Sequence, residues 1–324
     1  MAKPKVLLTR HIPEAGVLRL REACDLEENA DDHKMTPDEL RRRVADKAGL
    51  VCLLTDKVDD ALFAAAPNLK VVSNVAVGFD NVDVKAATKR NIAVCNTPGV
   101  LTETTADLAW TLLMATARRV VEGDRFMRGG RYTEWLPMLL LGGDIYGKTL
   151  GIIGMGRIGT AMARRAVGFE MRVLYYDSVR NTRAEKEYHT EFVPLERLLK
   201  ESDFISIHTP LLPETRHLIN RETLNQMKPT AYLINTSRGP VIDEAALVDA
   251  LRAKRIAGAA LDVYENEPAM APGLADLDNV VILPHLGSAS IETRSKMALL
   301  AAENCIAVLN GKRPPHSVNP EVLG

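Results

Sequence analysis

Short apolar runs alternate with longer amphipathic segments along most of the chain. A short apolar run predicts a buried strand, and apolar positions three or four residues apart predict a helix. In the first hundred residues these patterns place strands at 6–9, 50–54, 71–74 and 92–94, and helices at 14–22, 37–47 and 82–90. Strands that alternate with helices are typical of a parallel α/β sheet.

A long run rich in alanine, leucine and methionine follows at 103–119 and predicts a buried connecting helix, with Thr102 in position to cap it. The next segment, 121–147, has neither a helical nor a strand period and contains two Gly-Gly pairs and Trp135. We expect this segment to be an extended arm whose exposed apolar side chains contact another subunit.

Beyond the arm the alternation of strands and helices resumes. Strands are expected at 149–153, 173–176, 204–208, 231–235, 258–261 and 280–283, and a last helix at 290–309. A chain of 324 residues is long enough for two domains of ordinary size. We therefore expect two doubly wound parallel α/β domains, one made of residues 1–101 and 285–324, the other of residues 102–284 inserted into it.

Three glycines mark the first turn of the second domain. Gly154, Gly156 and Gly159 have the spacing G-x-G-x-x-G, follow an apolar strand and precede an alanine-rich helical run. The next predicted strand ends on Asp177. In this context Gly154 permits a tight turn, Gly156 lets the backbone approach a pyrophosphate, and Gly159 lets helix and strand pack closely. The motif favours a dinucleotide site, with phosphates at the helix N-terminus, over a glycine-rich turn without a ligand.

Three candidate catalytic side chains, Arg238, Glu267 and His285, follow the last three strands of this domain. The carboxyl ends of parallel strands lie at one edge of a sheet, so the three are expected to converge. A guanidinium binds a carboxylate through two parallel hydrogen bonds. An imidazolium can protonate a carbonyl oxygen as hydride arrives at the carbon, and a carboxylate behind such a histidine raises its pKa and fixes its tautomer. The set fits reduction of a 2-oxo acid, although each residue alone is also compatible with an ordinary loop position.

In the first domain a glycine turn follows the strand at 71–74 and contains Val77 and Gly78. Its backbone N–H groups can form a nest for a carboxylate. On spacing alone, an ordinary turn between strand and helix explains the segment equally well.

Composition excludes several classes of partner. Lysine and arginine number 41 and aspartate and glutamate 42, with no basic run, which argues against nucleic acid. No apolar run has the length of a membrane helix, and the N-terminal one is too short for a signal peptide. No metal-ligand spacing occurs, and the four cysteines are far apart, which fits a reducing cytoplasm: Cys24, Cys52, Cys95 and Cys305.

From end to end the chain resembles the D-isomer-specific 2-hydroxyacid dehydrogenases. The matching segments are the glycine motif, 78–83 (Gly-Phe-Asp-Asn-Val-Asp), 96–99 (Asn-Thr-Pro-Gly), 104–109 (Thr-Thr-Ala-Asp-Leu-Ala), 235–239 (Asn-Thr-Ser-Arg-Gly), 260–264 (Ala-Leu-Asp-Val-Tyr) with Glu267-Pro268, and 284–288 (Pro-His-Leu-Gly-Ser). Within that family, the segments 135–138 and 231–240 look most like those of glyoxylate/hydroxypyruvate reductases.

The resemblance implies a Rossmann dinucleotide-binding domain inserted into a flavodoxin-like substrate domain, with Arg238, Glu267 and His285 as the catalytic set. It implies cofactor contacts from Gly154, Gly156, Arg157, Ile158, Gly159, Asp177, Thr209, Thr236, Asp262 and Gly287. It implies substrate contacts from Leu53, Val77, Gly78, Arg238 and Trp135. It also implies a homodimer formed through the dinucleotide domains, with the arm around Trp135 reaching the partner.

The expected cofactor is NAD. Asp177 can accept hydrogen bonds from the ribose hydroxyls and repel a 2′-phosphate, which favours NADH, but Arg180 and Arg183 follow closely and leave NADPH open. The expected reaction is the reduction of glyoxylate and hydroxypyruvate. Oxidation of another D-2-hydroxy acid such as 3-phosphoglycerate, oxidation of phosphite, and a non-catalytic dinucleotide-sensing role like that of corepressors with this fold stay open.

Overall fold

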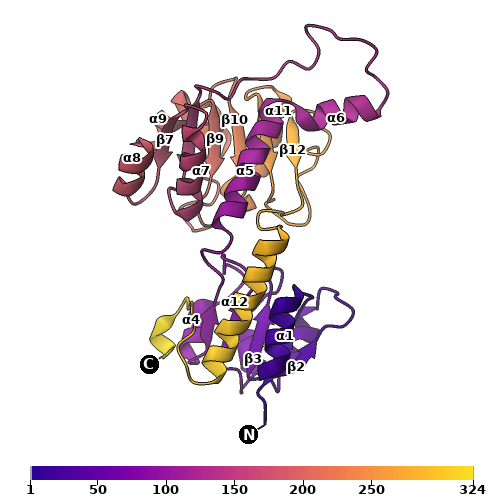
Figure 1. The fold of residues 1–324 in the computed structure, drawn as a ribbon, viewed down its shortest axis with the longest axis vertical. Helices are drawn as coiled ribbons and strands as arrows, with labels where there is room; N and C mark the ends of the chain where they lie inside the picture. Colours follow the sequence, from indigo (N-terminus) through magenta and orange to yellow (C-terminus); the bar gives the residue numbers. More distant parts are fainter. Residues whose placement is uncertain (1, 324) are drawn as a thin grey trace. The chain divides into compact units, whose positions relative to one another are not determined.

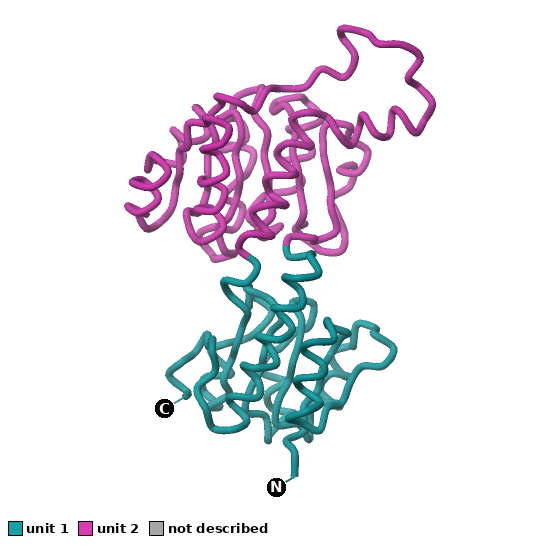
Figure 2. The backbone as a smooth tube through the Cα atoms, viewed as in Figure 1, with its two compact units in different colours: residues 1–101, 288–324 teal, residues 102–287 magenta. Residues whose placement is uncertain are grey.

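The computed structural model describes residues 2–323, which form two compact units. Unit 1 contains residues 1–101 and 288–324, and unit 2 contains residues 102–287 (Figure 2). The chain leaves unit 1, completes unit 2 and then returns, so unit 2 is an insertion in unit 1.

The sheet of unit 1 has five parallel strands in the order β2-β1-β3-β4-β5, which is the flavodoxin-like order. Its strands are β1 (Lys5–Leu8), β2 (Asp25–Glu28), β3 (Gly49–Cys52), β4 (Val71–Asn74) and β5 (Ala93–Cys95). Its helices are α1 (Glu14–Ala23), α2 (Pro37–Val44), α3 (Asp60–Ala65), α4 (Val84–Lys89), α12 (Ile291–Leu309) and the 3₁₀ helix η2 (Pro320–Leu323). The returning α12 packs so closely on α1 that a Cβ at Gly16 would lie 2.7 Å from the Ala298 backbone.

The sheet of unit 2 has seven parallel strands in the order β12-β11-β10-β9-β6-β7-β8. They are β6 (Thr149–Ile153), β7 (Arg172–Tyr176), β8 (Glu191–Phe192), β9 (Phe204–Ile207), β10 (Tyr232–Asn235), β11 (Gly258–Leu261) and β12 (Val280–Ile282). The helices are α5 (Thr102–Ala117), α6 (Val120–Arg128), α7 (Arg157–Val167), α8 (Thr182–Tyr188), α9 (Leu195–Glu201), α10 (Arg221–Leu224), α11 (Glu244–Arg252) and the 3₁₀ helix η1 (Gly239–Val241).

Helices cover both faces of this second sheet. Successive residues of a strand point to opposite faces, so neighbouring residues pack against different helices. Ile152 of β6 belongs to the core cluster that contains Leu112 of α5, and its neighbour Ile153 belongs to the cluster that contains Leu247 of α11. Figure 1 shows α5 and α7 lying across the strands. The prediction of two doubly wound parallel α/β domains is confirmed.

The boundary on the return to unit 1 lies between Gly287 and Ser288, three residues beyond the expected one. Asp262 accounts for the difference. Its backbone oxygen accepts the His285 N–H, and its carboxylate accepts the Leu286 and Gly287 N–H groups. These three bonds fix residues 285–287 to unit 2.

The prediction of an irregular segment over 121–147 is wrong at its start, where α6 is helical. No residue of α6 is buried in the structure. After residue 128 no helix or strand occurs until β6, and the exposed fractions of Trp135 and Met138 are 75% and 77%. The extended arm is therefore real but begins near Gly129.

Candidate active site

The carboxyl edge of the unit 2 sheet carries the candidate residues of this unit in a definite order. Arg238, Glu267 and His285 follow the neighbouring strands β10, β11 and β12, while the glycine motif and Asp177 follow the neighbouring strands β6 and β7. Strand β6 lies between β9 and β7, so the chain reverses its winding direction there. Doubly wound sheets bind ligands in the crevice at such a switch point.

Glu267 and His285 form a direct pair, with His285 Nδ1 2.9 Å from Glu267 Oε2. The second carboxylate oxygen accepts the Tyr264 N–H at 3.0 Å. Burial alone would raise the pKa of the Glu267 carboxyl, but the hydrogen bond and charge of His285, together with the Tyr264 N–H and the Arg238 charge, lower it below its ordinary value. Glu267 is therefore a carboxylate at neutral pH. It engages Nδ1 of His285, which leaves Nε2 for exchanging a proton with a ligand.

The backbone of His285 is held in a left-handed conformation with φ 58°. Such a conformation costs energy for a residue with a Cβ and persists where surrounding bonds impose it. Here the imposing group is the fully buried Asp262, whose oxygens accept the N–H groups of His285, Leu286 and Gly287 at 2.9, 2.6 and 2.7 Å. Asp262 thus aims the His285 ring by fixing its loop.

The turn that carries Arg238 is built by the buried Asn235 at the end of β10. Its side-chain oxygen accepts the Ser237 N–H at 2.9 Å, and its amide nitrogen donates to the Arg238 carbonyl at 3.0 Å. A Cβ on Gly239 would lie 1.9 Å from the Tyr264 backbone, so only glycine lets this turn pack against the loop after β11. That packing places the Arg238 charge where it acts on Glu267.

The glycine motif has the geometry that a dinucleotide phosphate turn needs. Gly154 has φ 95°, and a Cβ on Gly159 would lie 2.1 Å from the Gly154 oxygen, so both are required by the fold. At Gly156, by contrast, no described heavy atom outside Gly156 and its two chain neighbours lies within 4 Å of a Cβ position. Packing within residues 2–323 thus does not require a glycine there, and the missing side chain leaves the backbone open to the approach of a ligand. Arg157 and Ile158 open α7, whose N-terminus points its N–H groups toward this turn.

Two more groups on this edge fit a bound dinucleotide. The hydroxyl of Thr236 is buried and has no hydrogen-bond partner within the described part of the chain. A buried hydroxyl without a partner is rare unless a ligand or water satisfies it. His208, next to Thr209 at the end of β9, bonds the Ser206 hydroxyl through Nε2 at 2.8 Å, and burial lowers its pKa to about 3, so its ring is neutral.

Unit 1 contains the remaining predicted substrate residues, and its own hydrogen bonds order them. The Asn96 side chain donates to the Val77 carbonyl at 2.7 Å, and the Asn74 side chain donates to the Gly78 carbonyl at 2.9 Å. Asn81 donates to the Leu53 carbonyl at 3.1 Å and thereby joins the two loops. Leu53, Val77 and Gly78 therefore form one ordered edge of the unit 1 sheet.

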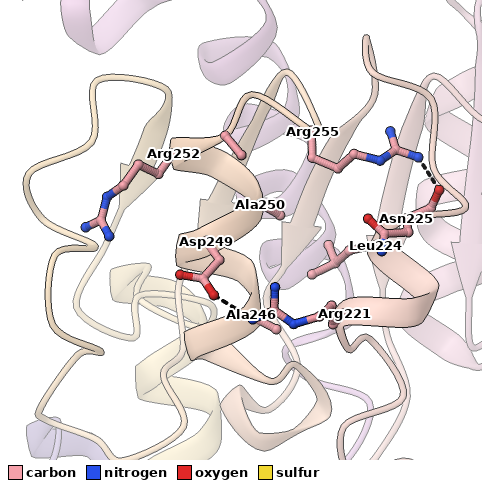
Figure 3. Close-up of a pocket in the computed structure, with 9 residues that line it drawn as sticks. Arg221, Leu224, Asn225, Ala246, Asp249, Ala250, Arg252 and Arg255 are labelled. Carbon is pink, nitrogen blue, oxygen red and sulfur yellow. Dashed lines mark hydrogen bonds and ion pairs between the residues drawn. The ribbon is translucent and has the colours of Figure 1, made fainter.

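Three cavities found elsewhere in the described chain are lined by none of the predicted site residues. Among residues 2–323 no group of three or more His, Cys, Asp and Glu side chains is arranged to hold a metal ion, and no helix is long and apolar enough to cross a membrane. A cavity of about 450 Å³ lies between α10 and α11 (Figure 3). Arg221 and Arg255 at its rim already bond Asp249 and the Asn225 carbonyl, and no predicted site residue lines it.

Comparison with known proteins identifies the family. Residues 110–287 match the family model described as D-isomer specific 2-hydroxyacid dehydrogenase, NAD binding domain. The chain is 56% identical over 323 residues to a glyoxylate reductase of Korarchaeum cryptofilum. The matched region covers 99% of this chain and 97% of that protein. A crystal structure of a Thermus thermophilus protein matches with a TM-score of 0.90 and 47% identity over 97% of this chain and 99% of that chain. An NADPH-dependent glyoxylate/hydroxypyruvate reductase of Sinorhizobium meliloti, solved with NADP and malonate, matches with a TM-score of 0.85 and 34% identity over 98% of this chain and 97% of that chain.

The chain belongs to the D-isomer specific 2-hydroxyacid dehydrogenases, and most of unit 2 corresponds to the NAD-binding domain of this family. The family that the sequence motifs indicated is confirmed. The prediction that the cofactor is a nicotinamide dinucleotide is confirmed as well.

Sequence reasoning gave no role to three residues that shape the site. Asn235 folds the Arg238 turn, and Tyr264 supplies an N–H to Glu267. The buried carboxylate of Glu244 accepts the Glu265 N–H and the Ala271 N–H, which fixes the loop carrying Glu267 from both sides. Glu244 opens a helix for which the sequence analysis gave no bounds, and its bonds to the N–H groups of Glu265 and Ala271 depend on the fold.

Proposed function

We propose that this protein reduces glyoxylate and hydroxypyruvate to the 2-hydroxy acids with a reduced nicotinamide dinucleotide. The observation that carries the proposal is the Glu267–His285 pair next to the Arg238 turn, on the same sheet edge as the dinucleotide motif. Relatives named glyoxylate reductase, at 56% identity over nearly the whole chain, support this choice of substrate.

In the proposed mechanism, the dinucleotide supplies the hydride when it is bound. Arg238 binds the substrate carboxylate through two parallel hydrogen bonds and so orients the carbonyl. His285 donates the proton on Nε2 to the carbonyl oxygen, while its Nδ1–H stays bonded to Glu267. By accepting that Nδ1–H, Glu267 fixes the orientation of the ring.

The other untested residue roles belong to the same proposal. Substrate contacts come from Leu53, Val77, Gly78 and Trp135, and cofactor contacts come from the glycine motif, Arg157, Ile158, Asp177, Thr209, Thr236, Asp262 and Gly287. Residues 1–101 with the C-terminal segment act as the substrate domain.

We propose that NADH is the preferred cofactor. The Asp177 carboxylate accepts the Met155 N–H at 2.6 Å and the Val179 N–H at 3.2 Å, which fixes it at the end of β7. A carboxylate at this point can bond the ribose hydroxyls and repels a 2′-phosphate. Because one relative is NADPH-dependent, the family alone does not decide the preference.

We propose a homodimer in which the arm after α6 contacts the partner. The large exposed fractions of Trp135 and Met138 mark the arm as a surface to be covered. A cytoplasmic location is part of the same proposal, and four buried free thiols fit a reducing compartment. A monomer mass in sedimentation equilibrium would contradict the dimer.

Steady-state assays with a panel of substrates test the proposed function. With NADH, glyoxylate and hydroxypyruvate should be reduced well and pyruvate poorly. With NAD⁺, 3-phosphoglycerate should not be oxidised appreciably, because segment 75–83 has no lysine or arginine to neutralise a phosphate. Efficient oxidation of 3-phosphoglycerate or phosphite, with feeble glyoxylate reduction, would overturn the substrate assignment. Dinucleotide binding without turnover of any member would point to a sensor.

Glu267→Gln should shift the alkaline limb of the reductive pH profile to lower pH. The carboxylate lies 2.9 Å from His285 Nδ1, and glutamine keeps the length of the side chain but removes the negative charge that faces the ring. The measurement is kcat/KM for glyoxylate across pH in both proteins, with NADH binding as the control for folding. An unmoved limb would show that the two side chains are not coupled in catalysis.

A further inference from the structure

Arg180, the arginine nearest to Asp177 along the chain, pairs with the carboxylate of Glu185. Arg180 Nε lies 2.8 Å from Glu185 Oε1, and its Nη2 lies 2.9 Å from Glu185 Oε2, so the ion pair is bidentate. The Arg180 side chain is 62% exposed, whereas that of Glu185 is only 17% exposed. The guanidinium therefore directs its paired donors at Glu185.

Glu185 is itself anchored to the sheet. The hydroxyl of Tyr175, a fully buried residue of β7, donates to Glu185 Oε1 at 2.6 Å and accepts the Asn181 N–H at 2.9 Å. Burial, followed by the Glu185 bond, raises the pKa of Tyr175 to about 12, so the phenol keeps its proton and remains a donor. The bonds from Arg180 and then Tyr175 lower the pKa of Glu185, which is a carboxylate at neutral pH. Unlike an ordinary surface pair, this one is tied to β7, the strand that Asp177 follows.

The second arginine of the segment has no such anchor. Arg183 pairs with Glu187 at 2.7 Å, one turn further along α8, and the exposed fractions of the two side chains are 83% and 40%. Exposed pairs of this kind contribute little and exchange readily with solvent. The Arg183–Glu187 pair therefore provides a matched control on the same helix.

We propose that Glu185 is a specificity-determining residue for the cofactor. In dinucleotide sites of this fold, an arginine near the acidic residue at the strand end accommodates the 2′-phosphate of NADP. By holding Arg180 in a bidentate pair, Glu185 withholds that cation, and the Asp177 carboxylate adds repulsion. This inference deepens the proposed NADH preference and rests on it.

Glu185→Gln tests the inference through binding, without turnover. Glutamine keeps the length of the side chain and an oxygen for Tyr175, but it releases the Arg180 charge. Calorimetric titration should show roughly tenfold tighter binding of adenosine 2′,5′-bisphosphate, as expected for a gained charge-assisted hydrogen bond, and unchanged binding of 5′-AMP. The ratio of kcat/KM for NADPH to that for NADH should rise in parallel. Glu187→Gln should behave like the wild type, and Arg180→Ala combined with Glu185→Gln should lose the gain.

Unchanged bisphosphate binding in Glu185→Gln, with 5′-AMP still bound, would overturn the inference. A gain that persists in the double variant would also overturn it, because the effect would then not pass through Arg180. A wild type that prefers NADPH would instead contradict the NADH preference itself. The wild-type measurement therefore separates failure of the proposed function from failure of the Glu185 role.

Discussion

Replacing His285 with alanine should lower kcat for glyoxylate reduction by about 10²–10⁴-fold, the usual contribution of a positioned general acid. The substitution removes the only nitrogen of the Glu267–His285 pair that is left to face a ligand, since Nδ1 is engaged 2.9 Å from Glu267. The carbonyl oxygen then has to take its proton from water. Steady-state kinetics at saturating cofactor measure the loss.

The matched control is His33→Ala in unit 1. His33 also pairs with a glutamate, Glu39, at 3.0 Å, but it lies far along the chain from the candidate site. It should leave kcat unchanged. Binding of NADH and the thermal unfolding midpoint should be preserved in both variants. A His285→Ala enzyme that keeps wild-type kcat would show that the proton reaches the substrate by another route.

The sequence predicts the strands well where burial is strong. The strands β3, β4, β6, β9 and β10 are buried along nearly their whole length, and each has an apolar run. Strand β2 was not predicted, because Asp25, Glu27 and Glu28 give an edge strand no such run. Helix α8 was not predicted either, since Ala184 is its only buried residue. Elements at the edge of a sheet need neither a continuous apolar run nor a buried helix face, so their sequences show neither pattern.

The residues of the candidate site also differ in whether the sequence alone can identify them. Arg238, Glu267 and His285 could be identified because each lies in the segment after a predicted strand, and parallel strands end at a common edge. The groups that aim them could not be identified in the same way. Glu244 acts through N–H groups of residues more than twenty positions away, and Asp262 fixes a loop that begins after a different strand. Contacts of this kind depend on which strands are neighbours, and a single sequence does not give the strand order.

Arg238→Lys should raise the KM for glyoxylate by roughly ten- to hundredfold, the range expected when a hydrogen bond to a charged group is lost, and should lower kcat as well. A guanidinium presents two donors in a plane that matches a carboxylate, whereas an ammonium offers a point charge and leaves the carbonyl poorly oriented. The fold should survive, because the turn is built by the Asn235 side chain and by the close packing of Gly239, which the substitution leaves in place.

The KM for NADH should stay near the wild-type value, and this separates a substrate role for Arg238 from general damage to unit 2. Arg216→Lys is the matched control: Arg216 lies in the same unit, is mostly exposed and pairs with Glu265 at 3.2 Å. A lysine there can keep an ion pair of this simple kind, so both kinetic constants should be unchanged. If Arg238→Lys binds and reduces glyoxylate as the wild type does, the substrate carboxylate is held elsewhere. The turn at Val77 and Gly78 in unit 1 would then become the first candidate for that role, because backbone N–H groups can bind a carboxylate without any guanidinium.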